Sequence, residues 1–306
     1  MTQDPESRFP DFIVPGAQKA GTTWLFECLQ GHPDIFVPKE KELHYFCAPD
    51  LCRHSTNTKG IDWYLSHFSR AEDNKVTGEM SVDYMIMPRI AEQLYQRNPD
   101  LKIIFMLRSP VDRAYSGYWM WRRNNLSSDA SLIERCAIEE KILQRSKYSD
   151  PVKAFLNLFG KDQVKVKIYE EVFSSPHHHL KDLFKFLEVD AAYLPPSMNM
   201  RIAPTRALTG MRGKMFYKVL GPVINSPLIL PVWRAVRAHT NSTAKAKSTG
   251  SRTERYPEMT SEEREYLEQQ LGEDREKFFE LIGRRVKAWD PSPTDSDIAK
   301  RSGHQS

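Results

Sequence analysis

The segment "FIVPGAQKAGTTWLFECL", residues 12–29, constrains the fold of this chain more than any other part of the sequence. It begins as an apolar strand, turns through a loop that contains Gly16 and Gly21, and continues with the pattern of a helix. Such a layout holds phosphate, because the backbone N–H groups of the loop and of the first helical turn point at the ligand. The segment therefore predicts an anion-binding loop at the end of a buried strand.

The spelling of this loop departs from G-x-x-x-x-G-K-[ST], the sequence of nucleotide-hydrolysing phosphate loops. Gly16 and Gly21 keep the spacing, but Thr22 stands where the lysine is expected, and Lys19 lies inside the loop. Those hydrolases also hold magnesium with a carboxylate at the end of another strand. Here the third apolar run ends at Arg108, whose guanidinium suits phosphate oxygens and repels cations. The pattern favours a ligand with one phosphate at the loop and another near Arg108.

The order of apolar runs predicts the fold class. Short runs rich in valine and isoleucine alternate with longer helical patterns. This order predicts an α/β protein of three layers, with a central parallel sheet flanked by helices, as in phosphate-loop proteins. One helix should end at Gly31 and Pro33, and another should begin near Pro110. The expected strands are residues 12–14, 76–79, 102–107 and 164–169, and a closing helix is expected over 261–283.

Length and charge set the class of protein. With 306 residues, 40% of them hydrophobic, the chain can form one large domain, which we assign to residues 1–290, with a variable helical and loop region at 200–255. Residues 291–306 are expected to be a disordered tail. The net charge of +4 comes without a long Lys/Arg block, so no nucleic-acid partner is expected. The first eleven residues show neither a signal nor an anchor, and a cytoplasmic location is expected.

The segment 215–237 is apolar, but three prolines, together with Lys218 and Arg234, interrupt it, so it is a poor membrane span. A packed surface element is the preferred interpretation. Weak contact with a membrane surface is the alternative.

Four cysteines are too few for a disulfide scaffold in a chain of this length. His44, Cys47, Cys52 and His54 can be written as a zinc quartet, although their spacing matches no zinc family that we can name. We expect reduced, partly buried thiols and no metal, and zinc is the alternative. The run 177–179, three histidines after a proline, is expected to be a solvated helix start.

Two segments together resemble the cofactor signatures of sulfotransferases that use 3′-phosphoadenosine 5′-phosphosulfate. These segments are "KAGTTWL" and "RSPVDRAYS", and the resemblance continues through "KGIDWYLSHF", "GEMSVDYM", "IYEEV" and "FFELIGRRVKAW". It covers nearly the whole chain except about residues 200–255. The resemblance implies a soluble, bacterial-type enzyme, similar to heparan-type sulfotransferase domains. It would transfer a sulfuryl group to a hydroxyl or amine of a small-molecule or carbohydrate acceptor without a metal, leaving adenosine 3′,5′-bisphosphate.

The resemblance also implies which residues bind the nucleotide. The loop would hold the 5′-phosphosulfate, and Arg108 and Ser116 have the eight-residue spacing of the pair that holds the 3′-phosphate. Trp24 matches a tryptophan that contacts adenine, and a core position is its alternative. The implied cofactor-binding residues are Gln18, Lys19, Ala20, Gly21, Thr22, Thr23, Trp24, Arg108 and Ser116.

Catalytic candidates follow from the same resemblance and from the chemistry of nearby side chains. Lys19 would stabilise the charge that grows on the bridging oxygen as the S–O bond breaks. Glu42, before "LHYF", best matches the general base of heparan-type enzymes, and partial burial is expected to raise its pKa. Glu40 is a near-register alternative, and His44 is another because neutral imidazole is a natural base near pH 7.

One position departs from the heparan-type pattern. Those members commonly carry a second lysine where this chain has Met80, which argues against a heparan-like substrate and a two-lysine mechanism. Two other functions are kept as alternatives: a phosphate-loop kinase or NTPase, and a nucleotide-binding protein with a degenerate, inactive site. The acceptor and the oligomeric state are not readable from the sequence.

Overall fold

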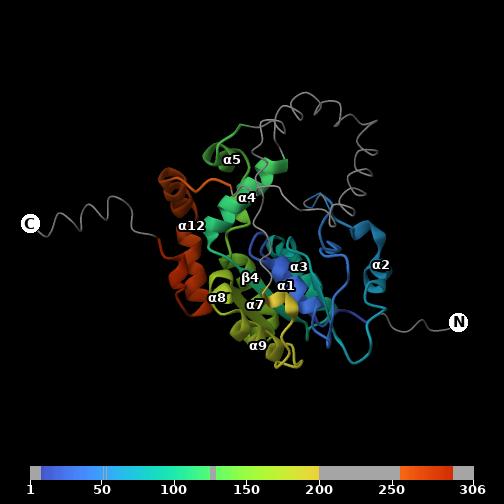
Figure 1. The fold of residues 1–306 in the computed structure, drawn as a ribbon. Helices are drawn as coiled ribbons and strands as arrows, with labels where there is room; N and C mark the ends of the chain where they lie inside the picture. Colours follow the sequence, from blue (N-terminus) through green and yellow to red (C-terminus); the bar gives the residue numbers. More distant parts are fainter. Residues whose placement is uncertain (1–7, 51, 53, 125–128, 200–255, 292–306) are drawn as a thin grey trace, which may run out of the picture.

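The centre of the protein is a parallel sheet of five strands in the order β2-β3-β1-β4-β5 (Figure 1). The structure, a computed structural model, describes residues 8–50, 52, 54–124, 129–199 and 256–291. The fold class and the four expected strands are confirmed, whereas β2, a two-residue edge strand, is too short to show an alternating pattern. The strands are β1 (Phe12–Gly16), β2 (Ile35–Phe36), β3 (Val76–Met80), β4 (Lys102–Leu107) and β5 (Val164–Ile168).

Helices cover both faces of the sheet. Because successive side chains of a strand point to opposite faces, Phe12 and Val14 join one core and Ile13 joins the other. The first core is closed by α1 (Thr22–Gln30), α8 (Tyr169–Ser174) and α9 (Pro176–Phe186). The second is closed by α2 (Ile61–Ser66), α3 (Pro88–Arg97), α7 (Ser149–Gln163) and the later part of α12 (Ser261–Ile282).

A third, smaller core lies beyond the sheet, where α4 and α5 are drawn in green beside α12 (Figure 1). It joins α4 to two short helices and to the first half of α12. Arg113 of α4 binds the second short helix and the turn that follows it. It donates from Nε to Ser146 Oγ (2.7 Å) and from Nη2 to the Ile142 carbonyl (2.6 Å). The elements are α4 (Pro110–Asn124), α5 (Leu132–Ile138) and α6 (Lys141–Gln144).

The helix ends follow local sequence rules. Proline occupies the first turn of α3 and α9, where its missing N–H costs nothing. Capping boxes begin α5 at Ser131 and α12 at Thr260, and α12 ends before Gly283, which has a left-handed φ of 69°. The closing helix is thus confirmed. Short 3-10 helices are η1 (Asn57–Lys59), η2 (Tyr84–Ile86), η3 (Pro196–Asn199) and η5 (Lys287–Trp289).

The connections between strands diverge between β1 and β4, and this gives the carboxyl edge of the sheet a topological switch point. The chain leaves β1 through α1 toward β2 on one side, and it leaves β4 through α4 toward β5 on the other. Ligands of open α/β sheets bind at such a switch point, outside the carboxyl ends of the two strands. The loop of Lys19 and the residue Arg108 both lie at this edge, because they follow β1 and β4 directly.

Several predictions concern residues outside the described ranges. These are the variable region 200–255, the apolar segment 215–237 within it, and the tail apart from its first residue, Pro291. Among the helices that the structure describes, none combines the length and the apolar character needed to cross a membrane.

Candidate active site

The loop between β1 and α1 has the form of an anion site. Gly21 is the N-cap of α1 and has a left-handed conformation (φ 87°, ψ 11°). A Cβ there would come within 3.0 Å of the Tyr169 ring, so both the backbone and the space favour glycine. Since glycine has no capping side chain, the amides of the first turn, at Thr22 and Thr23, remain for a ligand.

Cations converge on Lys19 from several elements. Burial lowers the pKa of Lys19 to about 8, and the charges of Arg123, Arg108, Arg113 and Lys41 act in the same direction. Such crowding is unfavourable in the free protein and favourable once a ligand with several negative charges is bound. Lys19 and Arg108 are candidates from the sequence, whereas Arg123, whose charge acts on Lys19 from the last turn of α4, is not.

Lys41 is a second basic residue that the sequence analysis did not assign. Its Nζ lies 3.5 Å from the hydroxyl of Thr22 and 2.8 Å from Oε1 of Glu42. Lys41 therefore joins the phosphate loop to the predicted base.

The guanidinium of Arg108 can still donate a hydrogen bond to a ligand. Its guanidinium stacks on Tyr169 at 5.0 Å, and its Asp112 contact is long, at 4.0 Å. Within the described chain, its buried Nε has no hydrogen-bond partner. Ser116 is also buried, two helical turns further on in α4. A phosphate near Arg108 would satisfy an otherwise orphaned donor.

The predicted catalytic residues have unusual backbone conformations. Lys19, Glu42 and His44 have φ values of 71°, 72° and 53°. Among the described non-glycine residues, only Glu188 shares this feature. Left-handed backbone costs free energy for such residues and tends to occur at functional sites. Three of the four described non-glycine residues with this backbone are thus residues that the sequence predicts to be catalytic, and their catalytic roles stay predictions.

Glu42 is ionised and held from both sides. Its Oε1 accepts from Lys41 Nζ (2.8 Å), and Oε2 lies 3.3 Å from Nε2 of His44. Burial favours the neutral carboxyl, but the His44 hydrogen bond and the Lys41 charge outweigh it and lower the pKa of Glu42 to about 2. The expected rise in this pKa is therefore wrong. Glu40, the near-register alternative, is exposed.

A buried carboxyl group, Glu79, organises the segment that carries Glu42 and His44. Glu79 accepts hydrogen bonds from Tyr64 OH (2.8 Å), Tyr84 OH (3.1 Å) and Ser81 Oγ. Ser81 Oγ in turn accepts from the backbone N–H of His44 (3.0 Å). Burial raises the pKa of Glu79, although the three hydroxyl donors oppose the rise. The sequence signal for this network is a glutamate inside an otherwise buried strand.

Two further positions are core residues in this structure. Met80 is 3% exposed and packs on the α1 face of the sheet, so that no cation occupies its place. Trp24 is 2% exposed, and its Nε1 donates to the Met198 carbonyl (3.1 Å). The core interpretation accounts for the position of Trp24, and its contact with adenine stays a prediction.

The structure brings together three of the four residues written as a zinc quartet. The ligand atoms of His44, Cys47 and Cys52 all lie within 4.8 Å of one another. His54 is exposed, with its ring centroid 6.1 Å from that of His44. All four cysteines of the chain are free and buried. His177 and His178 are exposed in the first turn of α9, as expected for a solvated helix start.

Comparison with known proteins identifies one family. Residues 9–215 match the sulfotransferase domain. The membrane-associated sulfotransferase kil1 of Dictyostelium discoideum is 34% identical over 145 residues, 42% of this chain and 29% of that protein. Heparan sulfate glucosamine 3-O-sulfotransferase 5 of Mus musculus is 25% identical over 224 residues, 69% of this chain and 62% of that protein. This chain therefore spans less than two thirds of the length of either relative.

A solved structure supports the same assignment. A sulfotransferase from Alicyclobacillus acidocaldarius is 27% identical and superposes with a TM-score of 0.67. The superposition covers 93% of this chain and 100% of that one. The similarity thus extends over the sheet and both helical layers.

Proposed function

We propose that this chain, which belongs to the sulfotransferase family, transfers a sulfuryl group from 3′-phosphoadenosine 5′-phosphosulfate to a hydroxyl or amine of a small-molecule or carbohydrate acceptor. The observation that carries the proposal is the convergence of Lys41, Arg108 and Arg123 on Lys19, at the switch point of the sheet. A ligand with several negative charges suits this surplus of cations. A kinase or NTPase suits it less, because the surplus repels magnesium.

The residues present fit the nucleotide at both of its anionic ends. The amides and hydroxyls of the loop, with Lys19, would hold the 5′-phosphosulfate. The orphaned Nε of Arg108 and the hydroxyl of Ser116 would hold the 3′-phosphate. The bound nucleotide supplies an activated sulfuryl group.

Two side chains would act on the reacting atoms. Lys19 stabilises, or protonates, the bridging oxygen on which charge develops. Glu42 accepts the proton of the acceptor hydroxyl or amine. A sulfuryl group carries less charge than a phosphoryl group, so the transfer itself does not require a metal clamp.

Lys41 couples the two ends of this site. In the free protein it holds Glu42 in an ionised and weakly basic state. Because its Nζ also reaches Thr22, an anion in the loop would attract Lys41 away from Glu42. Binding of the donor would then make Glu42 a stronger base.

A calorimetric titration tests the proposed function directly. Adenosine 3′,5′-bisphosphate should bind without metal and more tightly than ATP with magnesium. Preferential binding of Mg-ATP would instead establish the kinase or NTPase alternative. Turnover with an acceptor then separates an enzyme from a nucleotide-binding protein with a degenerate site. The cytoplasmic location, the single domain at 1–290 and the absence of a nucleic-acid partner stay predictions.

Arg108→Ala is expected to act mainly on nucleotide selectivity. A charge-assisted contact to the 3′-phosphate contributes about 1.5–3 kcal/mol, or roughly 10- to 100-fold in affinity. The variant should therefore lose most of its preference for adenosine 3′,5′-bisphosphate over adenosine 5′-monophosphate, as measured by calorimetry. Arg97→Ala, at an exposed arginine of α3, is the control and should keep the preference. Unchanged selectivity in both Arg108→Ala and Ser116→Ala would remove the second anion site from this proposal.

The lowered pKa of Lys19 predicts a basic limb in the pH profile. Lys19 must be protonated to stabilise the leaving oxygen, and in the free protein it loses its proton above pH 8 or so. The ratio kcat/KM for the donor should then fall about tenfold per pH unit above that value. In Lys19→Arg the guanidinium stays protonated, so the decline should disappear from the residual activity. The same decline in Lys19→Arg would assign this limb to another group.

A further inference from the structure

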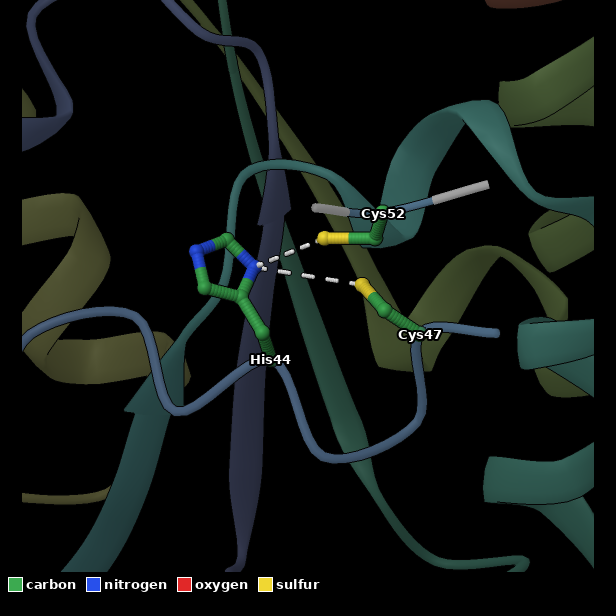
Figure 2. Close-up of side chains that lie close together, drawn as sticks. All are labelled: His44, Cys47 and Cys52. Carbon is green, nitrogen blue, oxygen red and sulfur yellow. Dashed lines mark hydrogen bonds between the residues drawn. The ribbon is translucent and has the colours of Figure 1, made fainter. Parts of the chain in front are cut away.

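Two thiols face a single ring nitrogen of His44 (Figure 2), and a carboxylate lies close to the same nitrogen. Nδ1 of His44 lies 3.8 Å from Sγ of Cys47 and 3.9 Å from Sγ of Cys52. The carboxylate of Asp83, which follows β3, brings Oδ2 to 3.9 Å from the same nitrogen and to 3.5 Å from Sγ of Cys52. Three groups of metal-ligand type thus lie within 4.8 Å of one another, and the carboxylate of Asp83 lies beside two of them. All four side chains are buried.

Hydrogen bonds alone do not account for this arrangement. A neutral imidazole nitrogen has either one lone pair or one N–H, so it cannot make good hydrogen bonds with Cys47 and Cys52 together. Thiols are also weak donors, and contacts near 4 Å are long. The distances are instead close to those between the ligands of a tetrahedral zinc ion. Bonds of about 2.3 Å to sulfur and 2.0 Å to nitrogen place these atoms about 3.6 Å apart.

The atoms on the outer side of the cluster are also held. Oδ1 of Asp83 is paired with Nη1 of Arg145, which leaves Oδ2 to face the cluster. Nε2 of His44 lies 3.3 Å from the carboxylate of Glu42, so Nε2 can carry the proton while the lone pair of Nδ1 points inward. Histidines that bind metals commonly donate their other N–H to a carboxylate in this way.

We propose that His44, Cys47, Cys52 and Asp83 form a tetrahedral zinc site. Two sulfur ligands and an imidazole select a borderline-soft divalent ion such as Zn²⁺. Both thiols lose their protons to solvent as the ion binds. Two thiolates and one carboxylate then leave a single negative charge on the zinc complex, which the adjacent Arg145 neutralises. Asp83 is thus the fourth ligand, in place of His54, which completes the quartet written from the sequence.

The zinc would be a positioning ion. It has four protein ligands and no open position for a substrate, as in structural zinc sites. It would fix the left-handed backbone at His44 and orient the Nε2–H toward Glu42. His44 could then not serve as the general base, because its remaining ring nitrogen is bonded to the ion. The proposal concerns metal binding and holds whether or not the chain transfers sulfuryl groups.

Competition with a chromophoric chelator tests the proposal. Metal-free, untagged, reduced protein should take up an equimolar amount of zinc from the chelator. Cys47→Ser and Cys52→Ser should each weaken zinc binding by more than about 100-fold. Arg145→Gln removes only the ion pair with the outer oxygen of Asp83, so it should weaken zinc binding by about 10- to 100-fold. The matched controls Cys28→Ser and Cys136→Ser change buried thiols outside the cluster and should bind zinc as the wild type does.

Cobalt(II) gives a second readout that needs no variant to fold. The cobalt form of the wild type should show thiolate-to-metal charge transfer and the intense visible bands of a tetrahedral ion. The control replaces the three histidines of α9, His177, His178 and His179, by glutamine. The charge-transfer band, the visible bands and the zinc affinity should not change, since these residues lie outside the cluster. No equimolar uptake, no thiolate band, equal affinity in Cys47→Ser and Cys28→Ser, or a Cys47–Cys52 disulfide in protein from cells would each overturn the proposal.

Discussion

Lys19→Met is expected to lower kcat by about 10²–10³, the loss seen when one donor to a developing oxyanion is removed. The affinity for adenosine 3′,5′-bisphosphate should change less than tenfold, because the contact is mainly with charge that grows in the transition state. Methionine keeps the length of the side chain and carries the same backbone cost at φ 71°. The two measurements are steady-state turnover and calorimetric titration of the product nucleotide.

Lys39→Met is the matched control, because Lys39 is an exposed lysine that does not act on the charge of Lys19. It should leave turnover and nucleotide affinity unchanged. If Lys19→Met instead weakens bisphosphate binding as much as it lowers kcat, Lys19 is an ordinary binding residue. Removing one of five crowded cations should also relieve repulsion in the free protein, so the variant is expected to be no less stable to heat.

The elements of the fold that could be predicted are those with a pattern in the local sequence. The strands of the sheet appear as apolar runs, and capping and glycine signals mark the helix ends, as at Thr260 and Gly283. Because Lys19 and Arg108 follow strands directly, a parallel sheet alone places them at one edge. Strand β2 escaped prediction because two residues cannot establish a period.

The rest of the site depends on contacts between distant segments. Lys41 meets Thr22 across 19 positions, and the charge of Arg123, in the last turn of α4, acts on Lys19 across about a hundred positions. Asp83 contacts Cys52 from the segment that follows β3. This contact cannot be foreseen from the sequence, so the quartet written from the sequence has His54 as its fourth member. These pairs follow no regular spacing along the chain, so they could not be predicted from the sequence.

The pKa of Glu42 shows how two neighbouring side chains reverse the effect of burial. Burial alone raises the pKa of a carboxyl, and the sequence predicted burial correctly. The hydrogen bond from His44 and the charge of Lys41 exceed that effect. Both neighbours were visible in the sequence, but their orientation toward Glu42 was not.

Glu42→Gln is expected to reduce turnover by about 10²–10⁴ with nucleotide affinity nearly unchanged. Glutamine keeps the size and the acceptor oxygen of glutamate but cannot take a proton. Steady-state rates at saturating donor measure the effect, and Glu40→Gln, an exposed glutamate in the same loop, should be fully active. His44→Ala should lose much less, compared at equal folded fraction. A nearly active Glu42→Gln beside an inactive, folded His44→Ala would exclude Glu42 as the base, and a zinc-free wild type that stays active would then transfer the role to His44.

The acidity of the acceptor separates a base from a residue that only positions the substrate. A hydroxyl that ionises more readily needs less help in losing its proton, so the defect of Glu42→Gln should shrink along a series of increasingly acidic acceptors. A positioning role gives the same defect throughout the series. Glu79 is another carboxyl of this region, but three hydroxyls bind it in the interior. It therefore cannot reach an acceptor without breaking the network that holds His44, and a constant defect would leave proton removal to solvent.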